Sequence, residues 1–176
     1  GYTGLKRWRH GSVAERVLQA AGVPVLLVRA GEKEAKDSRQ LALCRRILVP
    51  LDGSAMSEQV LPIVMPIAQA LDAELILFQV SIVYSVESHS YHTDQIAQDY
   101  LAQVAGRLRE QEVEASTATG IGVVAESIIR YAEAHHVDLI AMCTHGRTGP
   151  ARWALGSVAD RVLRAAGIPI LLVRAS

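Results

Sequence analysis

The sequence predicts an α/β fold in which helices cover both faces of a parallel sheet. Half of the 176 residues are apolar and 5% are aromatic, a balance typical of helix-covered sheets rather than of all-β sandwiches. Short runs rich in Val, Ile and Leu alternate with longer amphipathic segments. Alternation of this kind predicts right-handed β-α-β crossovers, and therefore parallel strands.

Five short apolar runs predict strands, the third of them an outer strand because it alternates weakly. These runs are 45–51, 74–83, 113–119, 137–144 and 168–174. Four intervening segments have the apolar spacing of helices, and they are 55–71, 93–111, 123–135 and 156–166. Pro62 and Pro66 should bend the first helix or shift its start.

The chain begins with a copy of its own end. Residues 1–30 align with residues 146–175 without a gap, and 21 of the 30 pairs are identical. Such similarity predicts a duplicated domain. Residues 1–30 would be the end of a first copy, 31–43 a polar linker and 44–176 a complete second domain. The alternative is a separate N-terminal arm with an unrelated role.

Composition argues against several classes of partner. Eighteen basic residues balance eighteen acidic ones, so the excess of Lys and Arg that drives non-specific nucleic-acid binding is absent. No apolar run reaches the roughly 18–20 residues of a membrane span. Cys44 and Cys143 form no spaced metal or disulfide framework, which favours a cytoplasmic location.

Three loops follow predicted strands at the sheet edge where α/β folds bind ligands: 51–55, 83–92 and 144–156. The last of these ends in Gly156-Ser157 at a predicted helix start, where backbone N–H groups favour a phosphate. Alternatively, its glycines serve only turn geometry and Ser157 caps the helix. The spacing matches neither the P-loop nor the dinucleotide-binding glycine motif.

An aspartate stands at the end of the first predicted strand of the complete domain, in the segment VPLDGS (49–54). A carboxylate at this place can accept hydrogen bonds from ribose hydroxyls or from an adenine amine. It can equally cap the turn or helix that follows.

Three segments, ILVPLDGS, VDLIAMCTHGRTG and GSVADRVLRAAGIPILLVR, together resemble the universal stress protein family. The resemblance covers 44–176, and 1–30 resembles the C-terminal segment of the family. It implies a Rossmann-like, five-stranded parallel open sheet with the strand order 3-2-1-4-5 and helices on both faces. One branch of the family binds ATP through the motif G-x2-G-x9-G-[ST], and another branch lacks it.

The motif carries over with one departure, because its first glycine falls on Cys143, whose larger side chain would narrow the pocket. Asp52 matches the acidic residue that contacts the nucleoside, and Pro50 and Val80 match positions that line the adenine pocket. The residues expected to contact the nucleotide are Pro50, Asp52, Gly53, Ser54, Val80, Cys143, Thr144, His145, Gly146, Arg147, Gly149, Gly156, Ser157 and Val158.

The expected function is an ATP-binding regulatory module of the stress response, with Mg²⁺ as a companion of the nucleotide. No set of nucleophile, base and orienting group can be assembled, so the protein is expected not to be an enzyme. The alternative is a nucleotide-free dimerisation module of the same fold. Family dimers imply that 24–29 pairs antiparallel with 169–174, within one chain or between two. The protein is also expected to have regulatory protein partners, which the sequence does not identify.

Overall fold

The computed structural model describes residues 16–18, 20–28, 44–81, 90–144 and 155–175. They form one mixed sheet of six strands, with the order β1-β6-β5-β2-β3-β4. Its strands are β1 (Val25–Leu27), β2 (Arg46–Pro50), β3 (Glu74–Ser81), β4 (Ala115–Ile121), β5 (Leu139–Thr144) and β6 (Ile170–Arg174). Its helices are η2 (Ser57–Val60), α2 (Leu61–Leu71), α3 (Ser90–Arg109), α4 (Val124–Ala134) and α5 (Ser157–Ala165).

The α/β class is confirmed, and the described sheet is mixed with six strands, because the N-terminal segment expected to pair with the last strand adds an antiparallel strand to it. The strands β4, β3, β2, β5 and β6 run parallel to their neighbours. Numbered within 44–176, their order reads 3-2-1-4-5. The sixth strand, β1, is antiparallel to β6. Without it, the apolar edge of β6 would remain open for pairing.

The register of β1 against β6 places Val25 opposite Leu172, Leu26 opposite Leu171 and Leu27 opposite Ile170. Of the expected pairing between 24–29 and 169–174, the part that joins 25–27 to 170–172 is therefore present within one chain. Residues 16–18 and 20, which precede β1, are helical.

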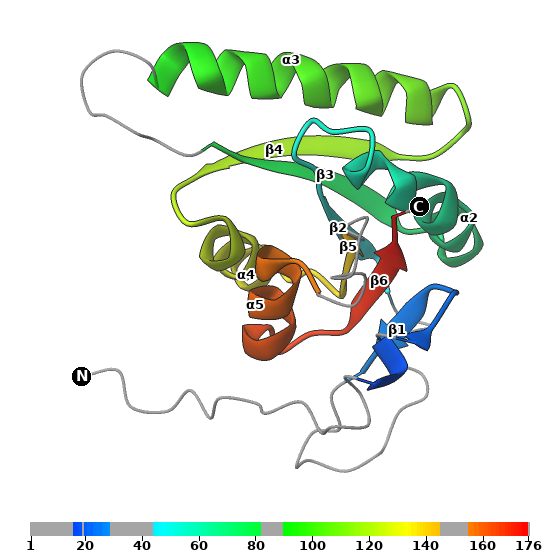
Figure 1. Ribbon diagram of the computed structural model, residues 1–176. Helices are drawn as coiled ribbons and strands as arrows, with labels where there is room; N and C mark the ends of the chain where they lie inside the picture. Colours follow the sequence, from blue (N-terminus) through cyan, green and yellow to red (C-terminus); the bar gives the residue numbers. More distant parts are fainter. Residues whose placement is uncertain (1–15, 19, 29–43, 82–89, 145–154, 176) are drawn as a thin grey trace.

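Helices cover both faces of the sheet and enclose two apolar cores (Figure 1). Consecutive residues of β3 alternate between them, because successive side chains of a strand point to opposite faces. Leu77 packs in the core under α2 and α3, whereas Phe78 packs in the core under α4 and α5. Both side chains are almost fully buried.

Proline sets the start of the first long helix, as expected. Residues 57–60 form a short 3₁₀ helix, η2, and α2 then begins at Leu61 with Pro62 in its first turn. A proline there removes no helical hydrogen bond. α3 begins at Ser90, three residues earlier than expected, so the polar segment 90–92 belongs to the helix and not to the loop. No helix in the described part of the chain is long and apolar enough to cross a membrane.

Candidate functional site

A cavity of about 490 Å³ opens where the carboxyl ends of β2, β3 and β5 meet the first turns of α4 and α5. Its volume lies within the roughly 300–1,000 Å³ typical of small-molecule sites. The strand order reverses here, because β3 and β5 flank β2, and ligands of α/β sheets bind at such a reversal. The lining residues are Pro50, Leu51, Asp52, Ser57, Val80, Val124, Ile128, Met142, Cys143, Leu155, Gly156, Ser157, Val158 and Ala159.

Hydrogen bonds among neighbouring residues shape the turn that carries Asp52. The backbone N–H and the hydroxyl of Ser54 donate to Asp52 Oδ1 at 2.9 and 2.6 Å. The Ser57 hydroxyl donates to the Ser54 carbonyl at 2.8 Å and accepts from the Asp52 N–H at 3.3 Å. Gly53 has a φ of 84°, a conformation that glycine adopts without strain. The turn therefore holds the exposed Asp52 carboxylate at the cavity, where it can accept from ligand hydroxyls.

The start of α5 forms another wall of the same cavity. Gly156 is the N-cap residue, with φ −57° and ψ 146°, and among the described residues no side chain caps the helix. Ser157 is therefore a first-turn residue, one of the two places expected for it. The N–H groups of a helix's first turn and the positive end of its dipole favour an anion.

Apolar side chains make up much of the remaining lining. Pro50 and Val80, which the sequence indicated, line the cavity together with Val124, Ile128 and Met142, which it did not. A flat aromatic base suits such a surface, since small-molecule sites are lined mainly by apolar groups. Val124 and Ile128 stand four apart on one face of α4, and this spacing was the available signal for them.

Cys143 lies near the end of β5, is 7% exposed and lines the cavity. Burial raises the pKa of its thiol to about 11, and the charge of Asp52 adds to the increase. The thiol is therefore protonated near neutral pH, and a protonated thiol is a poor nucleophile. What the side chain contributes to the cavity is therefore its volume.

The other predicted residues lie beside the cavity or outside the described residues. Gly53 and Ser54 shape the Asp52 turn, and Thr144 ends β5, where its carbonyl accepts from the Ala175 N–H at 3.2 Å. None of these three is a lining residue. The predictions for His145, Gly146, Arg147 and Gly149 fall in 145–154, outside the described residues.

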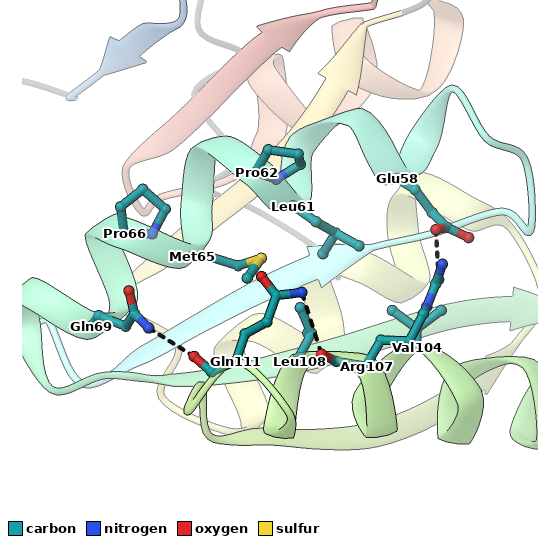
Figure 2. A pocket seen from close by; sticks show the side chains of 10 residues that line it. All are labelled: Glu58, Leu61, Pro62, Met65, Pro66, Gln69, Val104, Arg107, Leu108 and Gln111. Atoms are coloured by element: carbon teal, nitrogen blue, oxygen red, sulfur yellow. Dashed lines mark hydrogen bonds and ion pairs between the residues drawn. The ribbon is translucent and has the colours of Figure 1, made fainter.

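A second hollow, a groove of about 520 Å³, lies between α2 and α3 (Figure 2). At one end Arg107 Nη2 donates to Glu58 Oε2 at 2.6 Å, and at the other Gln69 Nε2 donates to the Gln111 carbonyl at 2.9 Å. Although it is slightly larger, the groove lies away from the strand ends and these polar groups bind one another. We therefore assign the candidate ligand site to the cavity at the strand ends.

Within the described ranges, no three side chains of His, Cys, Asp or Glu are grouped as metal ligands. The cavity lining accordingly offers a carboxylate, helix N–H groups and apolar walls. This combination suits a ligand that carries a flat ring, hydroxyls and an anionic group.

Comparison with known proteins identifies the family. The model of the universal stress protein family matches residues 44–174. Universal stress protein MJ0531 of Methanocaldococcus jannaschii is 35% identical over 141 residues, which are 75% of this chain and 83% of that protein. A universal stress protein structure from Archaeoglobus fulgidus matches with a TM-score of 0.74 at 22% identity, covering 100% of this chain and 60% of that one.

A universal stress protein solved in complex with cAMP matches with a TM-score of 0.64 at 21% identity, covering 75% of this chain and 98% of that one. These structural likenesses concern the fold. The chain spans 60% of the length of the Archaeoglobus structure and of its relatives in Mycobacterium tuberculosis. With its α/β fold, the family match over most of its length and a close relative in MJ0531, the chain belongs to the universal stress protein family.

Proposed function

We propose that the chain binds an adenine nucleotide, ATP, in the cavity at the strand ends and acts as a regulatory module of the stress response. One observation carries the proposal: Asp52 and the first turn of α5, which no described side chain caps, line one cavity together with apolar side chains. These three surfaces correspond to the three parts of a nucleotide. Asp52 would accept from the ribose, α5 would bind the phosphates, and the apolar wall would contact the base.

The apolar wall for the base consists of Pro50, Val80 and Met142. At the other end, the backbone N–H groups of Ser157 and Val158 would donate to phosphate oxygens. Mg²⁺ would enter with the nucleotide, because this ion keeps several waters and is commonly held by substrate phosphates with one or two carboxylates. It would neutralise phosphate charge, while the chain's own residues fix the nucleoside.

We propose that the site binds the nucleotide without a committed reaction. Hydrolysis or transfer requires a nucleophile or a general base near the phosphates. Asp52 is the one carboxylate among the described lining residues, and it stands at the proposed nucleoside end. The Cys143 thiol, with a pKa of about 11, stays protonated at neutral pH. Any hydrolysis should therefore be slow.

Titration calorimetry with ATP, cAMP and inorganic tripolyphosphate tests the proposal, together with acid extraction of the purified protein to detect bound nucleotide. The cAMP complex of a related protein makes cAMP the natural competitor to compare. Asp52→Ala should weaken ATP binding by at least about tenfold, the lower end of the effect of one hydrogen bond to a charged group, and leave tripolyphosphate binding unchanged. Absence of bound nucleotide and of heat at millimolar ATP would overturn the proposal.

A nucleotide-free dimerisation module is the second candidate, and Cys143 is the observation that favours it. Its side chain occupies the position of the first glycine of the ATP-binding motif and lines the cavity. A negative result with all three ligands would support this candidate, with β1 and β6 as the surfaces for self-association.

We also propose that residues 1–30 are the end of a preceding copy of the domain, joined by the linker 31–43. The burial of equivalent residues supports this. Leu26 is 40% exposed and Val28 is 56% exposed, whereas their counterparts Leu171 and Val173 are 5% and 6% exposed. The second copy buries these side chains in its own sheet, so another sheet of the same fold would cover those of the first.

In this proposal the antiparallel contact between β1 and β6 joins two domains as a pseudo-dimer, and the same strands could join two chains. Size-exclusion chromatography with light scattering distinguishes a monomer from a dimer.

We further propose a cytoplasmic location, in agreement with the two buried cysteines Cys44 and Cys143, neither of which forms a disulfide. Regulatory protein partners would read the nucleotide state of the domain.

A further inference from the structure

Glu58 connects the turn at the candidate site to α3. It follows Ser57, a lining residue that is hydrogen-bonded to the Asp52 N–H. The two oxygens of its carboxylate have separate partners: Tyr100 Oη donates to Oε1 at 3.0 Å, and Arg107 Nη2 donates to Oε2 at 2.6 Å. A continuous set of contacts therefore runs from Asp52 to a helix outside the cavity.

The two partners of Glu58 stand seven residues apart, about two turns, on the same side of α3. Figure 2 shows the Arg107 side chain extending from α3 to Glu58 at one end of the groove. Two contacts two turns apart fix a carboxylate better than one contact does. Glu58 is thereby held in one orientation, and so is the short helix η2 that carries it.

Glu58 contributes little to the attachment of α3 itself. α3 packs on the sheet through a row of buried side chains, Ala97, Leu101, Val104, Ala105 and Leu108. Gln69 of α2 and Gln111, in the turn that follows α3, give a separate link between α2 and the chain beyond α3. The Arg107 side chain is more than half exposed, and exposed ion pairs add little to stability. The link therefore constrains the smaller partner, which is the turn of residues 52–57.

We propose that Glu58 is a positioning residue for nucleotide binding, which holds Ser57 and the Asp52 turn in place by anchoring them to Tyr100 and Arg107 of α3. This inference rests on the proposed function, because it assigns Asp52 to the nucleoside. Burial and the neighbouring Glu58 raise the pKa of the Tyr100 phenol, and the charge of Asp52 adds to the increase. The Tyr100 phenol thus interacts electrostatically with both Glu58 and Asp52.

The test compares Glu58→Ala, Glu58→Gln and Tyr100→Phe with the control Gln69→Ala, which breaks the α2–α3 link at the far end of the groove. Calorimetry measures ATP and inorganic tripolyphosphate binding to each. Glu58→Ala should weaken ATP binding roughly fivefold, and Tyr100→Phe should weaken it about threefold, the size of a single hydrogen bond. Glu58→Gln keeps a single acceptor oxygen and can accept from only one of the two partners, so its loss of ATP binding should lie between those of Glu58→Ala and wild type.

Tripolyphosphate binding should stay within about twofold of wild type in all four variants, because α5 and not Asp52 binds phosphate. A general loss of structure would instead weaken both ligands alike. Amide hydrogen exchange of the ligand-free protein gives a second readout. The N–H groups of Ser54 and Ser57, which donate to Asp52 Oδ1 and Ser54 Oγ within the turn, should exchange faster in Glu58→Ala and not in Gln69→Ala.

The inference is wrong if Glu58→Ala binds ATP as wild type does, or if it weakens ATP and tripolyphosphate equally. A wild-type chain that binds no ATP would instead refute the proposed function, and the positioning role would fall with it. In that case faster exchange in Glu58→Ala would still show that Glu58 orders the turn of residues 52–57. The failure of the proposed function can therefore be distinguished from the failure of this inference.

Discussion

Replacing Cys143 by glycine tests whether this side chain limits nucleotide binding, and the structure predicts two effects of opposite sign. Stability should fall, because the thiol is 7% exposed. Loss of two buried heavy atoms costs about 1.5 kcal/mol, and glycine in a strand adds about 1 kcal/mol. A slope of about 2 kcal/mol/M for a chain of this size converts the sum into a urea midpoint lower by about 1 M.

ATP affinity should rise in the same variant. Cys143 lines the cavity, and one extra methylene-sized group in a pocket changes binding by about 1–3 kcal/mol, so we expect about tenfold tighter binding by calorimetry. Cys143→Ala keeps Cβ and removes only the sulfur. This variant should show most of the increase in ATP affinity and should lose about 1 kcal/mol of stability. If both variants lose stability as expected but bind ATP as wild type does, the side chain is no obstacle and the reasoning is refuted.

Two further predictions concern the fold. Gly120→Ala should destabilise by about 2 kcal/mol, because its Cβ would lie 2.7 Å from Cζ of the buried Phe78. Gly106→Ala in α3, which meets nothing within 4 Å, should instead stabilise by up to about 1 kcal/mol, and urea melts with the opposite ranking would contradict both. A third prediction concerns stability at alkaline pH. Burial raises the pKa of the Cys44 and Cys143 thiols from 9.0 to about 11. Their contribution to stability is complete below pH 9 and is lost as the pH rises through 11. The double variant Cys44→Ala/Cys143→Ala should flatten this decline, and an unchanged decline would exclude the thiols as its cause.

Much of the fold could be predicted because the strands are short apolar runs with a clear change of period to the helices. The run at 45–51 became β2, and Pro62 shifted the start of α2 as its missing N–H requires. The start of α3 could not be placed, because the segment 90–92 is polar and has no apolar period. The pairing of β1 with β6 was expected from the resemblance to family dimers and not from a local pattern.

The residues of the candidate site likewise include some that a local sequence pattern indicates and some that it does not. Asp52 could be predicted because it directly follows a strand, and Gly156 because it precedes a helix. Ser57 and Met142 could not, since a serine in a helix and a methionine in a buried strand have no signal of their own. They reach the cavity through packing, Ser57 by way of η2 and Met142 at the end of β5.

The duplicated segment shows that neighbours, and not the segment alone, decide what a sequence does. Leu26 and Leu171 are equivalent leucines paired across the same ladder, yet the first is exposed and the second is buried. The start of α5 follows the same logic. In the proposed site its N–H groups would bind the phosphates, whereas the nucleoside would be bound by Asp52, more than a hundred residues earlier. Since Glu58 holds that turn against α3, nucleotide specificity should respond to changes in α3 before it responds to changes in the repeated segment.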